Sequence, residues 1–149
     1  MARVKIDLPD KFDFHTEIQV CVANVNAGGH LGNDSLLAFL NEALMRFLGA
    51  KGFPGLVVGG CAVIVADQAT IYKSEGFHGD IMRIDVAATG FHKRGFDIVY
   101  RVTNKVTGKE VALAKTGMMF FDYDKRQIAE TPQAFKSAFG IDSGPDKGR

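Results

Sequence analysis

Apolar residues recur with a period of two along much of this chain, which is the spacing of a β-strand with one buried face. Stretches with this alternation or with a continuous apolar run lie at residues 16–25, 56–72, 80–88, 96–104 and 111–123. Gly59-Gly60 falls inside the second stretch and predicts a bulge or a close approach by another segment. Thr107-Gly108-Lys109 falls between the last two stretches and predicts a hairpin turn.

One stretch has the period of a helix instead. Between Ser35 and Leu48, leucine and phenylalanine recur three and four positions apart, and other apolar residues extend the surface around most of the cylinder. Asn33 or Asp34 can cap the first turn by accepting hydrogen bonds from free backbone N–H groups, and Gly49 can end the helix. A helix about 21 Å long with this pattern is predicted to be buried on most sides.

The order of elements is therefore one strand, one long helix and about four further strands. Because strands and helices do not alternate, this order favours an α+β fold, with an antiparallel sheet wrapped around one long central helix. Residues 133–139 could add one or two helical turns, and the polar tail from about residue 143 is expected to be disordered. No linker or internal repeat divides the chain, so we expect a single domain over residues 1–149.

Composition excludes several classes of function. The 149 residues carry 18 Lys and Arg against 17 Asp and Glu, so no basic surface of the kind that binds nucleic acid is expected. Cys21 and Cys61 lie in apolar runs and are expected to be small buried side chains, because their spacing fits no metal pair. The charged N-terminus and the lack of an apolar stretch of about 18 residues predict a soluble cytoplasmic protein without membrane contact.

The segment NAGGHLGNDSLLAFLNEAL, which starts at Asn26, resembles the 4-hydroxybenzoyl-CoA thioesterase-like branch of the hotdog superfamily. That branch carries an Asp-x-x-Gly-His-Val-Asn-Asn loop and then a helix ending near Glu-Ala-Arg. The positions that match by identity and spacing are Gly29, His30, Asn33, Glu42 and Ala43. Residues 79–135 are similar to the closing strands and the proline-containing tail of the same branch. The resemblance covers nearly the whole chain and implies a hotdog fold.

The resemblance also implies where a thioester would bind. The catalytic Asp of that branch falls at Asn26, whose amide cannot act as a base but can donate to a carbonyl or orient a water. The predicted substrate loop consists of Gly28, Gly29, His30, Leu31 and Asn33. Its glycines would let a carbonyl approach the backbone, and the helix start would offer N–H groups to the developing negative charge. The alternatives are an ordinary glycine-rich turn and an Asn26 that satisfies its own backbone.

Several residues near this loop could take part in proton transfer. Glu42, two turns into the helix, either faces a subunit interface as a general base or acceptor, or pairs with Arg46 on the surface. Asp34 is better suited to cap the helix, and His30 matches a family position that is usually structural. A surface location is expected for the histidines that fit no constellation, His15, His78 and His92.

CoA carries phosphates that a basic residue could contact. Lys93 and Arg94 lie in a predicted turn and could do so, as could Lys73 or Lys115, while the alternative is a solvated charged turn. No cofactor is expected beyond the CoA of the substrate. No metal is expected either, because no spacing of His, Cys and carboxylates suggests one.

The predicted function is hydrolysis of a small or medium acyl-CoA thioester to the acid and free CoA. The alternative is a non-catalytic hotdog protein that binds an acyl-CoA or another acyl group, which Asn26 favours. Hydratase chemistry fits less well, because it usually needs a paired Asp and His before the helix. The nearly all-round apolar helix in so short a chain predicts a homodimer or homotetramer, with the site between subunits.

Overall fold

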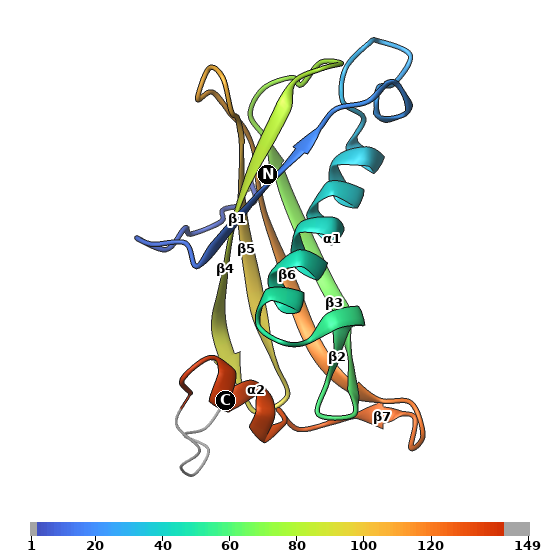
Figure 1. The fold of residues 1–149 in the computed structure, drawn as a ribbon, viewed down its shortest axis with the longest axis vertical. Coiled ribbons are helices and arrows are strands. Elements are labelled where there is room, and N and C mark those ends of the chain that lie inside the picture. The colour runs from blue at the N-terminus through green and yellow to red at the C-terminus, as the bar shows by residue number, and fades with distance from the viewer. Residues whose placement is uncertain (1–2, 142–149) are drawn as a thin grey trace.

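The computed structural model describes residues 3–141 as a curved antiparallel sheet with one long helix against its inner face (Figure 1). The strands are β1 (Phe14–Gln19), β2 (Val57–Val58), β3 (Cys61–Tyr72), β4 (Ile81–His92), β5 (Gly95–Asn104), β6 (Glu110–Asp122) and β7 (Gln127–Ile128). Their order in the sheet is β1-β4-β5-β6-β3-β2, and β7 pairs with β6. This architecture confirms the predicted α+β class. The tail from residue 143 lies outside the described residues.

The long helix α1 (Asn33–Ala50) packs one face against the sheet (Figure 1). Its buried residues are Leu36, Phe39, Leu40, Ala43, Leu44, Phe47 and Leu48. They form one core cluster with sheet residues such as Ile84 and Phe120. The other side of α1 is open to solvent in one chain, where the Met45 side chain is 46% exposed. A single chain therefore buries one face of the helix, not most of its circumference as the sequence predicted.

Both ends of α1 differ from the prediction. Gly32 is the N-cap residue and no side chain caps the first turn, so neither Asn33 nor Asp34 serves as the cap. Asp34 instead lies within the first turn, where the positive end of the helix dipole favours its carboxylate. Gly49 continues the helix, because glycine also tolerates helical geometry. Gly52 lies just beyond the end of the helix and has a φ of +94°, the left-handed conformation that is common after helices.

The predicted strand over residues 56–72 is two strands joined by a tight turn. Gly59 and Gly60 form that turn with φ angles of 55° and 83°, the geometry that two-residue hairpin turns need. Gly59 also meets the expectation of a close approach, because a Cβ atom there would lie 2.8 Å from the Cβ of Pro132. The bulge falls elsewhere in β3, between Val65 and Asp67.

The first strand is shorter than its apolar pattern. It ends at Gln19, and the chain then turns through the 3-10 helix η1 (Val22–Asn24). Cys21 therefore lies outside the sheet and is exposed, while Cys61, the first residue of β3, is half-buried. The prediction of two buried thiols was wrong because both cysteines lie at or beyond strand ends, where the apolar run continues but the sheet cover does not.

A short helix, α2 (Gln133–Ala138), confirms the helical turns expected near the C-terminus. It closes one end of the core with Phe135, whose ring centroid lies 4.5 Å from that of Phe96. Tyr100 is buried in the sheet and shares a 3.2 Å hydrogen bond with the Thr116 hydroxyl. Burial raises the pKa of Tyr100 to about 12. Within residues 3–141, no helix is long and apolar enough to cross a membrane.

Candidate active site

Asn26 organises the loop that leads into α1. Its side-chain oxygen Oδ1 accepts hydrogen bonds from the backbone N–H groups of Gly28 at 3.0 Å and His30 at 3.2 Å. Its own backbone N–H donates to the His30 carbonyl at 2.8 Å, and Gly29 completes the turn with a φ of +81°. Asn26 therefore does satisfy its own turn through Oδ1, whereas its Nδ2 has no hydrogen-bond partner among residues 3–141.

The same loop is fixed to the segment that joins β3 to β4. The Leu31 backbone N–H donates to the Gly76 carbonyl at 2.8 Å, and His30 pairs with Phe77 as an isolated β-bridge. Gly76 is buried against Leu31, where an added Cβ atom would lie 3.2 Å from the Leu31 Cβ. Two segments far apart in sequence are thereby held side by side, and the loop is positioned before the helix begins.

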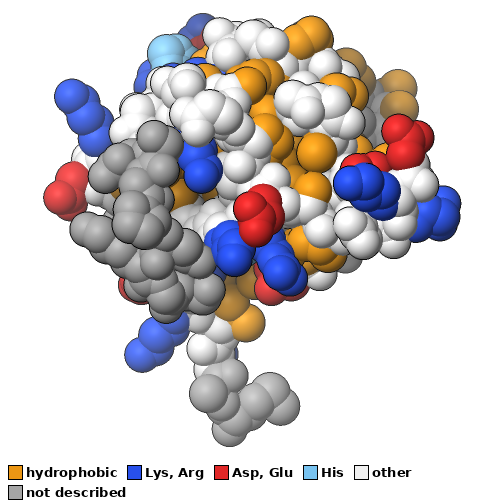
Figure 2. Space-filling model, turned by 90° about the horizontal axis from the view of Figure 1, so that it is seen from below, with side chains coloured by type: hydrophobic (Ala, Val, Ile, Leu, Met, Phe, Trp, Pro, Cys, Tyr) orange, Lys and Arg blue, Asp and Glu red, His pale blue; other side chains and the backbone are white. Residues whose placement is uncertain are grey.

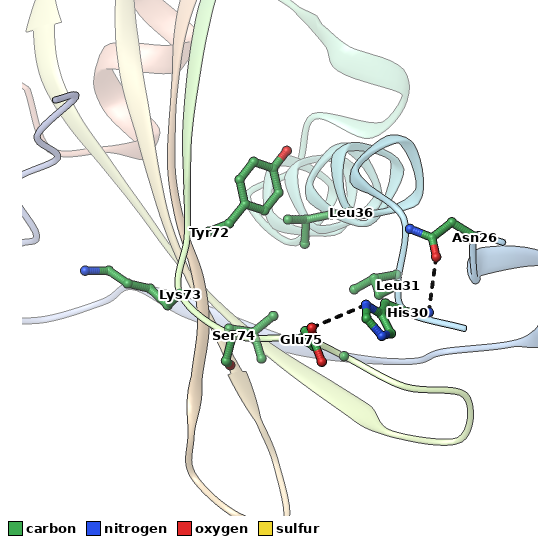
Figure 3. A pocket seen from close by; sticks show the side chains of 10 residues that line it. Asn26, His30, Leu31, Leu36, Tyr72, Lys73, Ser74 and Glu75 are labelled. Atoms are coloured by element: carbon green, nitrogen blue, oxygen red, sulfur yellow. Dashed lines mark hydrogen bonds and ion pairs between the residues drawn. The ribbon is translucent and has the colours of Figure 1, made fainter. Parts of the chain in front are cut away.

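A pocket of about 320 Å³ lies where this loop, the start of α1 and the end of β3 meet (Figure 3). Its apolar lining comes from Leu31, Leu36 and Val111, and its polar lining includes Asn26 and His30. The structure thus brings three of the predicted site residues, Asn26, His30 and Leu31, to one pocket. The remaining predicted loop residues, Gly28, Gly29 and Asn33, do not line it.

The first turn of α1 adjoins this pocket. Leu36, which lines the pocket, donates its backbone N–H to the Gly32 carbonyl at 2.9 Å, and no side chain caps the N–H groups before it. Such N–H groups have no partner within the helix and form the positive end of its dipole. Together with the Asn26 amide, they are chemically suited to stabilise negative charge on a carbonyl oxygen.

A carboxylate that sequence reasoning missed also lines the pocket. Glu75 follows β3, and its Oε1 lies 3.5 Å from Nδ1 of His30, as the dashed line in Figure 3 marks. The His30 ring packs edge-on against Phe77 with a centroid distance of 5.3 Å. Of the pocket-lining residues in the described chain, Glu75 alone carries a carboxylate. No local motif marks it, because its proximity to His30 depends on the pairing of two distant segments.

Glu42 does not line this pocket. Its Oε2 accepts a hydrogen bond from Nε of Arg46 at 3.0 Å, and both side chains are substantially exposed. Arg46 also donates to the Thr16 hydroxyl at 2.8 Å and to the Glu17 carbonyl at 3.1 Å, so it ties α1 to β1. The surface pair weighed in the sequence is therefore present in one chain. A catalytic role for Glu42 stays a prediction.

Lys93 and Arg94 lie far from the pocket within one chain. They form the turn between β4 and β5, at the lower end of the molecule in Figure 1, whereas the loop before α1 is at the upper end. Figure 2 views that lower end and shows acidic and basic side chains next to one another. Nζ of Lys93 lies 3.5 Å from Oε1 of Glu130, so this turn is not purely basic.

The two other candidate lysines differ in location. Lys115 pairs with Asp97 at 3.4 Å and lies outside the pocket, whereas Lys73 lines it. Figure 3 shows the Lys73 ammonium directed away from His30 and Asn26. Lys73 is thus the basic side chain that could meet an anionic group at the pocket's edge.

The remaining histidines stay apart from the pocket. His15 and His78 are exposed as expected, but His92 is half-buried. Its Nδ1 accepts a hydrogen bond from the Arg94 backbone N–H at 3.3 Å. Within residues 3–141, no group of three or more His, Cys, Asp and Glu side chains is arranged to hold a metal ion.

Comparisons with solved structures find the same architecture. A 1,4-dihydroxy-2-naphthoyl-CoA thioesterase from Synechocystis has a TM-score of 0.77 and 20% identity, over 89% of this chain and 98% of that one. A gentisyl-coenzyme A thioesterase has a TM-score of 0.74 and 15% identity, over 83% and 99%. A Staphylococcus aureus protein in complex with CoA has a TM-score of 0.78 and 14% identity, over 91% and 86%. At such identities these likenesses show the fold alone.

Comparison with protein-family models identifies the family of this chain, whereas the structural likenesses show only its fold. A search of curated proteins finds no match. Residues 20–139, which include α1, the loop before it and all of β3 to β6, match the model of the thioesterase-like superfamily. The match spans most of the chain and confirms the resemblance drawn from the segment around Asn26. This chain belongs to the thioesterase-like superfamily.

Proposed function

We propose that this protein hydrolyses small or medium acyl-CoA thioesters to the acid and free CoA. The observation that carries the proposal is the pocket beside α1. There, two groups that have no side-chain partner within residues 3–141, Nδ2 of Asn26 and the first turn of α1, adjoin apolar lining residues. Family membership supports thioester hydrolysis in general. One structural neighbour is a 1,4-dihydroxy-2-naphthoyl-CoA thioesterase, another is a gentisyl-coenzyme A thioesterase, and a third was solved in complex with CoA. These neighbours favour CoA as the carrier of the acyl group.

The pocket fits the steps of thioester hydrolysis. When water attacks the carbonyl carbon, negative charge develops on the carbonyl oxygen, and N–H groups fixed beforehand stabilise that charge. The Asn26 amide is held by two hydrogen bonds to Oδ1, so its Nδ2 is oriented before a substrate arrives. In this proposal Asn26 is a donor to the thioester oxygen. It does not replace the base that the aspartate of related enzymes supplies.

The size and lining of the pocket bear on the acyl group. A volume of about 320 Å³ lies at the lower end of the range of roughly 300–1,000 Å³ that is usual for small-molecule sites. Leu31, Leu36 and Val111 would contact an acyl chain or ring. Lys73 would face the phosphates of CoA from the edge of the pocket, and Lys93 and Arg94 could do so only if a second subunit brought them there.

A homodimer is part of the proposal. β2 covers only the start of β3, at Cys61 and Ala62, so the outer edge of β3 from Val63 to Tyr72 has no strand partner within residues 3–141. Such an edge of about 33 Å pairs readily with a second strand. Val65 and Tyr72 on this strand are 46% and 55% exposed and would gain cover. A partner subunit at this edge would also adjoin Tyr72 in the pocket, and the Glu42 side chain of that partner could then come within reach of the substrate. A homotetramer would be a pair of such dimers.

The test is a hydrolysis screen with purified protein over acyl-CoA esters of increasing size, including aromatic ones, with the released thiol as readout. We expect turnover of small or medium acyl groups and a loss of activity as the chain outgrows the pocket. Binding of an acyl-CoA by calorimetry without turnover of any ester would favour the alternative, a non-catalytic acyl-CoA binding protein. The same esters on pantetheine would show whether the CoA phosphates contribute.

A further inference from the structure

The pocket contains an imidazole and a carboxylate in contact, and they come from segments that only the fold brings together. Nδ1 of His30 lies 3.5 Å from Oε1 of Glu75, and the two side chains are 38% and 59% exposed. The pair is therefore reachable by water and by a ligand in the pocket that both residues line. Apo sites often hold such contacts at a longer distance than they have with substrate bound.

Three contacts fix the position of His30. Its backbone N–H donates to Asn26, its carbonyl accepts from the Asn26 N–H, and its ring packs edge-on against Phe77. A carboxylate beside Nδ1 favours the tautomer with the proton on that nitrogen, which leaves the lone pair on Nε2. No hydrogen bond occupies Nε2 within the described part of the chain. An imidazole held in this way can accept a proton at Nε2.

We infer that His30 accepts the proton of the attacking water and that Glu75 is the positioning residue that orients it; the inference rests on the proposed hydrolysis. Water oxygen bonds to the thioester carbon while its proton passes to Nε2 of His30. The carbonyl electron pair moves to the oxygen, which the Asn26 amide stabilises. The carbonyl then re-forms, the carbon–sulfur bond breaks, and the CoA sulfur takes the proton from His30. Water and thioester thus give acid and thiol, with no further reactant.

The other carboxylates near the helix are less suited to this role in one chain. Glu42 lies nine residues beyond Asn33, which is about 13 Å along the helix axis, and is paired with Arg46. Asp34 is exposed and does not line the pocket. Asn26 and His30 belong to one hydrogen-bonded turn, so a donor for the carbonyl oxygen and an acceptor for the water proton are held in a fixed relation.

The first experiment reads the tautomer of His30 without any activity measurement. In protein labelled with ¹⁵N at histidine, ring-nitrogen chemical shifts above neutral pH report which nitrogen carries the proton. We expect the Nδ1–H form for His30 in the wild type and a shift towards Nε2–H in Glu75→Ala. The matched control is Glu130→Ala, which removes a carboxylate that is 70% exposed, against 59% for Glu75, from another 3.5 Å pair at the other end of the molecule. Wild-type His30 in the Nε2–H form would overturn the inference.

The second experiment is kinetic. With the best ester of the screen, His30→Gln should lower kcat by about 10²–10⁴-fold, the range for a general base. Glu75→Ala should lower kcat by about 10–100-fold, with KM little changed, because it acts through His30. Glu130→Ala and His15→Gln, both outside the pocket, serve as controls, and melting temperatures confirm that each variant folds.

The outcomes separate the two proposals. A wild-type protein that turns over no thioester refutes the proposed function, and the inference that rests on it fails as well. A wild-type protein that is active while His30→Gln or Glu75→Ala keeps full kcat refutes only the inference. In that case the proton acceptor must lie elsewhere, and Glu42 reached from a partner subunit is the next candidate.

Discussion

Asn26 has two roles in the proposed site, and two substitutions can separate them. Oδ1 accepts hydrogen bonds from the backbone N–H groups of Gly28 and His30 and holds the loop, while Nδ2 is a donor without a partner in the described part of the chain. Asn26→Ala removes both roles. Asn26→Asp keeps an acceptor for the two backbone N–H groups but replaces the amide donor with a second oxygen. The two variants should therefore differ in stability and agree in activity.

The magnitudes follow from the exposure and chemistry of these contacts. A hydrogen bond contributes about 0.5–1.5 kcal/mol net, and in this exposed loop water can replace part of what is lost. We expect Asn26→Ala to cost about 1 kcal/mol, or about 2–4 °C in melting temperature for a domain of this size. Asn26→Asp should cost less, because a charged acceptor strengthens both bonds. Either variant should lose about 10²–10³-fold in kcat, the usual effect of removing one oxyanion donor.

The assay pairs thermal unfolding with hydrolysis of the best ester of the screen. Asn41, exposed on α1 and outside the pocket, provides the matched controls Asn41→Ala and Asn41→Asp. An Asn26→Asp protein as active as the wild type, or more active, would refute the donor role. That result, with a changed pH profile, would indicate that a carboxylate here acts as the base that related enzymes use.

Three further predictions concern other parts of the molecule. Glu42→Gln should cost under about 0.5 kcal/mol and leave kcat unchanged if Glu42 only pairs with Arg46 on the surface; a fall of about 10²–10⁴-fold at constant KM would support a catalytic role instead. Val65→Lys, on the open part of β3, should shift the protein from dimer to monomer in sedimentation at micromolar concentration, and a monomeric wild type would contradict the shared-edge proposal. Because the folded-state pKa of Tyr100 is about 12 against an ordinary 10.0, its neutral phenol stabilises the fold fully below about pH 10, and this contribution is lost as pH rises through about 12. Denaturant unfolding between about pH 9 and 12 should show a weaker alkaline loss of stability in Tyr100→Phe, and parallel curves for both proteins would count against this linkage.

Much of the fold could be predicted because the local spacing of apolar residues indicates where the helix and the strands lie. The helical spacing between Ser35 and Leu48 located α1, and alternation located the cores of β4, β5 and β6. Each of these elements turns one face towards the core, so the side chains on that face must be apolar whatever lies opposite. The same segment around Asn26 indicated the family, and three of its residues, Asn26, His30 and Leu31, do line one pocket.

The wrong predictions concern places where the run of apolar residues continues beyond the end of the strand. The pattern continues past Gln19 and through Gly59-Gly60, although the chain turns at both places. Backbone turning depends on φ angles and on neighbours such as Pro132, which leave little trace in hydrophobicity. Cys21 was misplaced for this reason, and α1 continues through Gly49 to Ala50, so that Gly52 and not Gly49 is the glycine that follows the helix.

The sequence by itself determined the class of fold, the family and the loop that carries Asn26 and His30. Tertiary structure decided that Glu75 meets His30, that Glu42 is turned to Arg46, and that Lys93 lies at the opposite end from the pocket. The physical reason is that periodicity records only which face of an element is covered. Which distant residues become neighbours depends on strand pairing and on the hydrogen bonds between loops, such as that from Leu31 to Gly76, and these form only when the whole sheet is assembled.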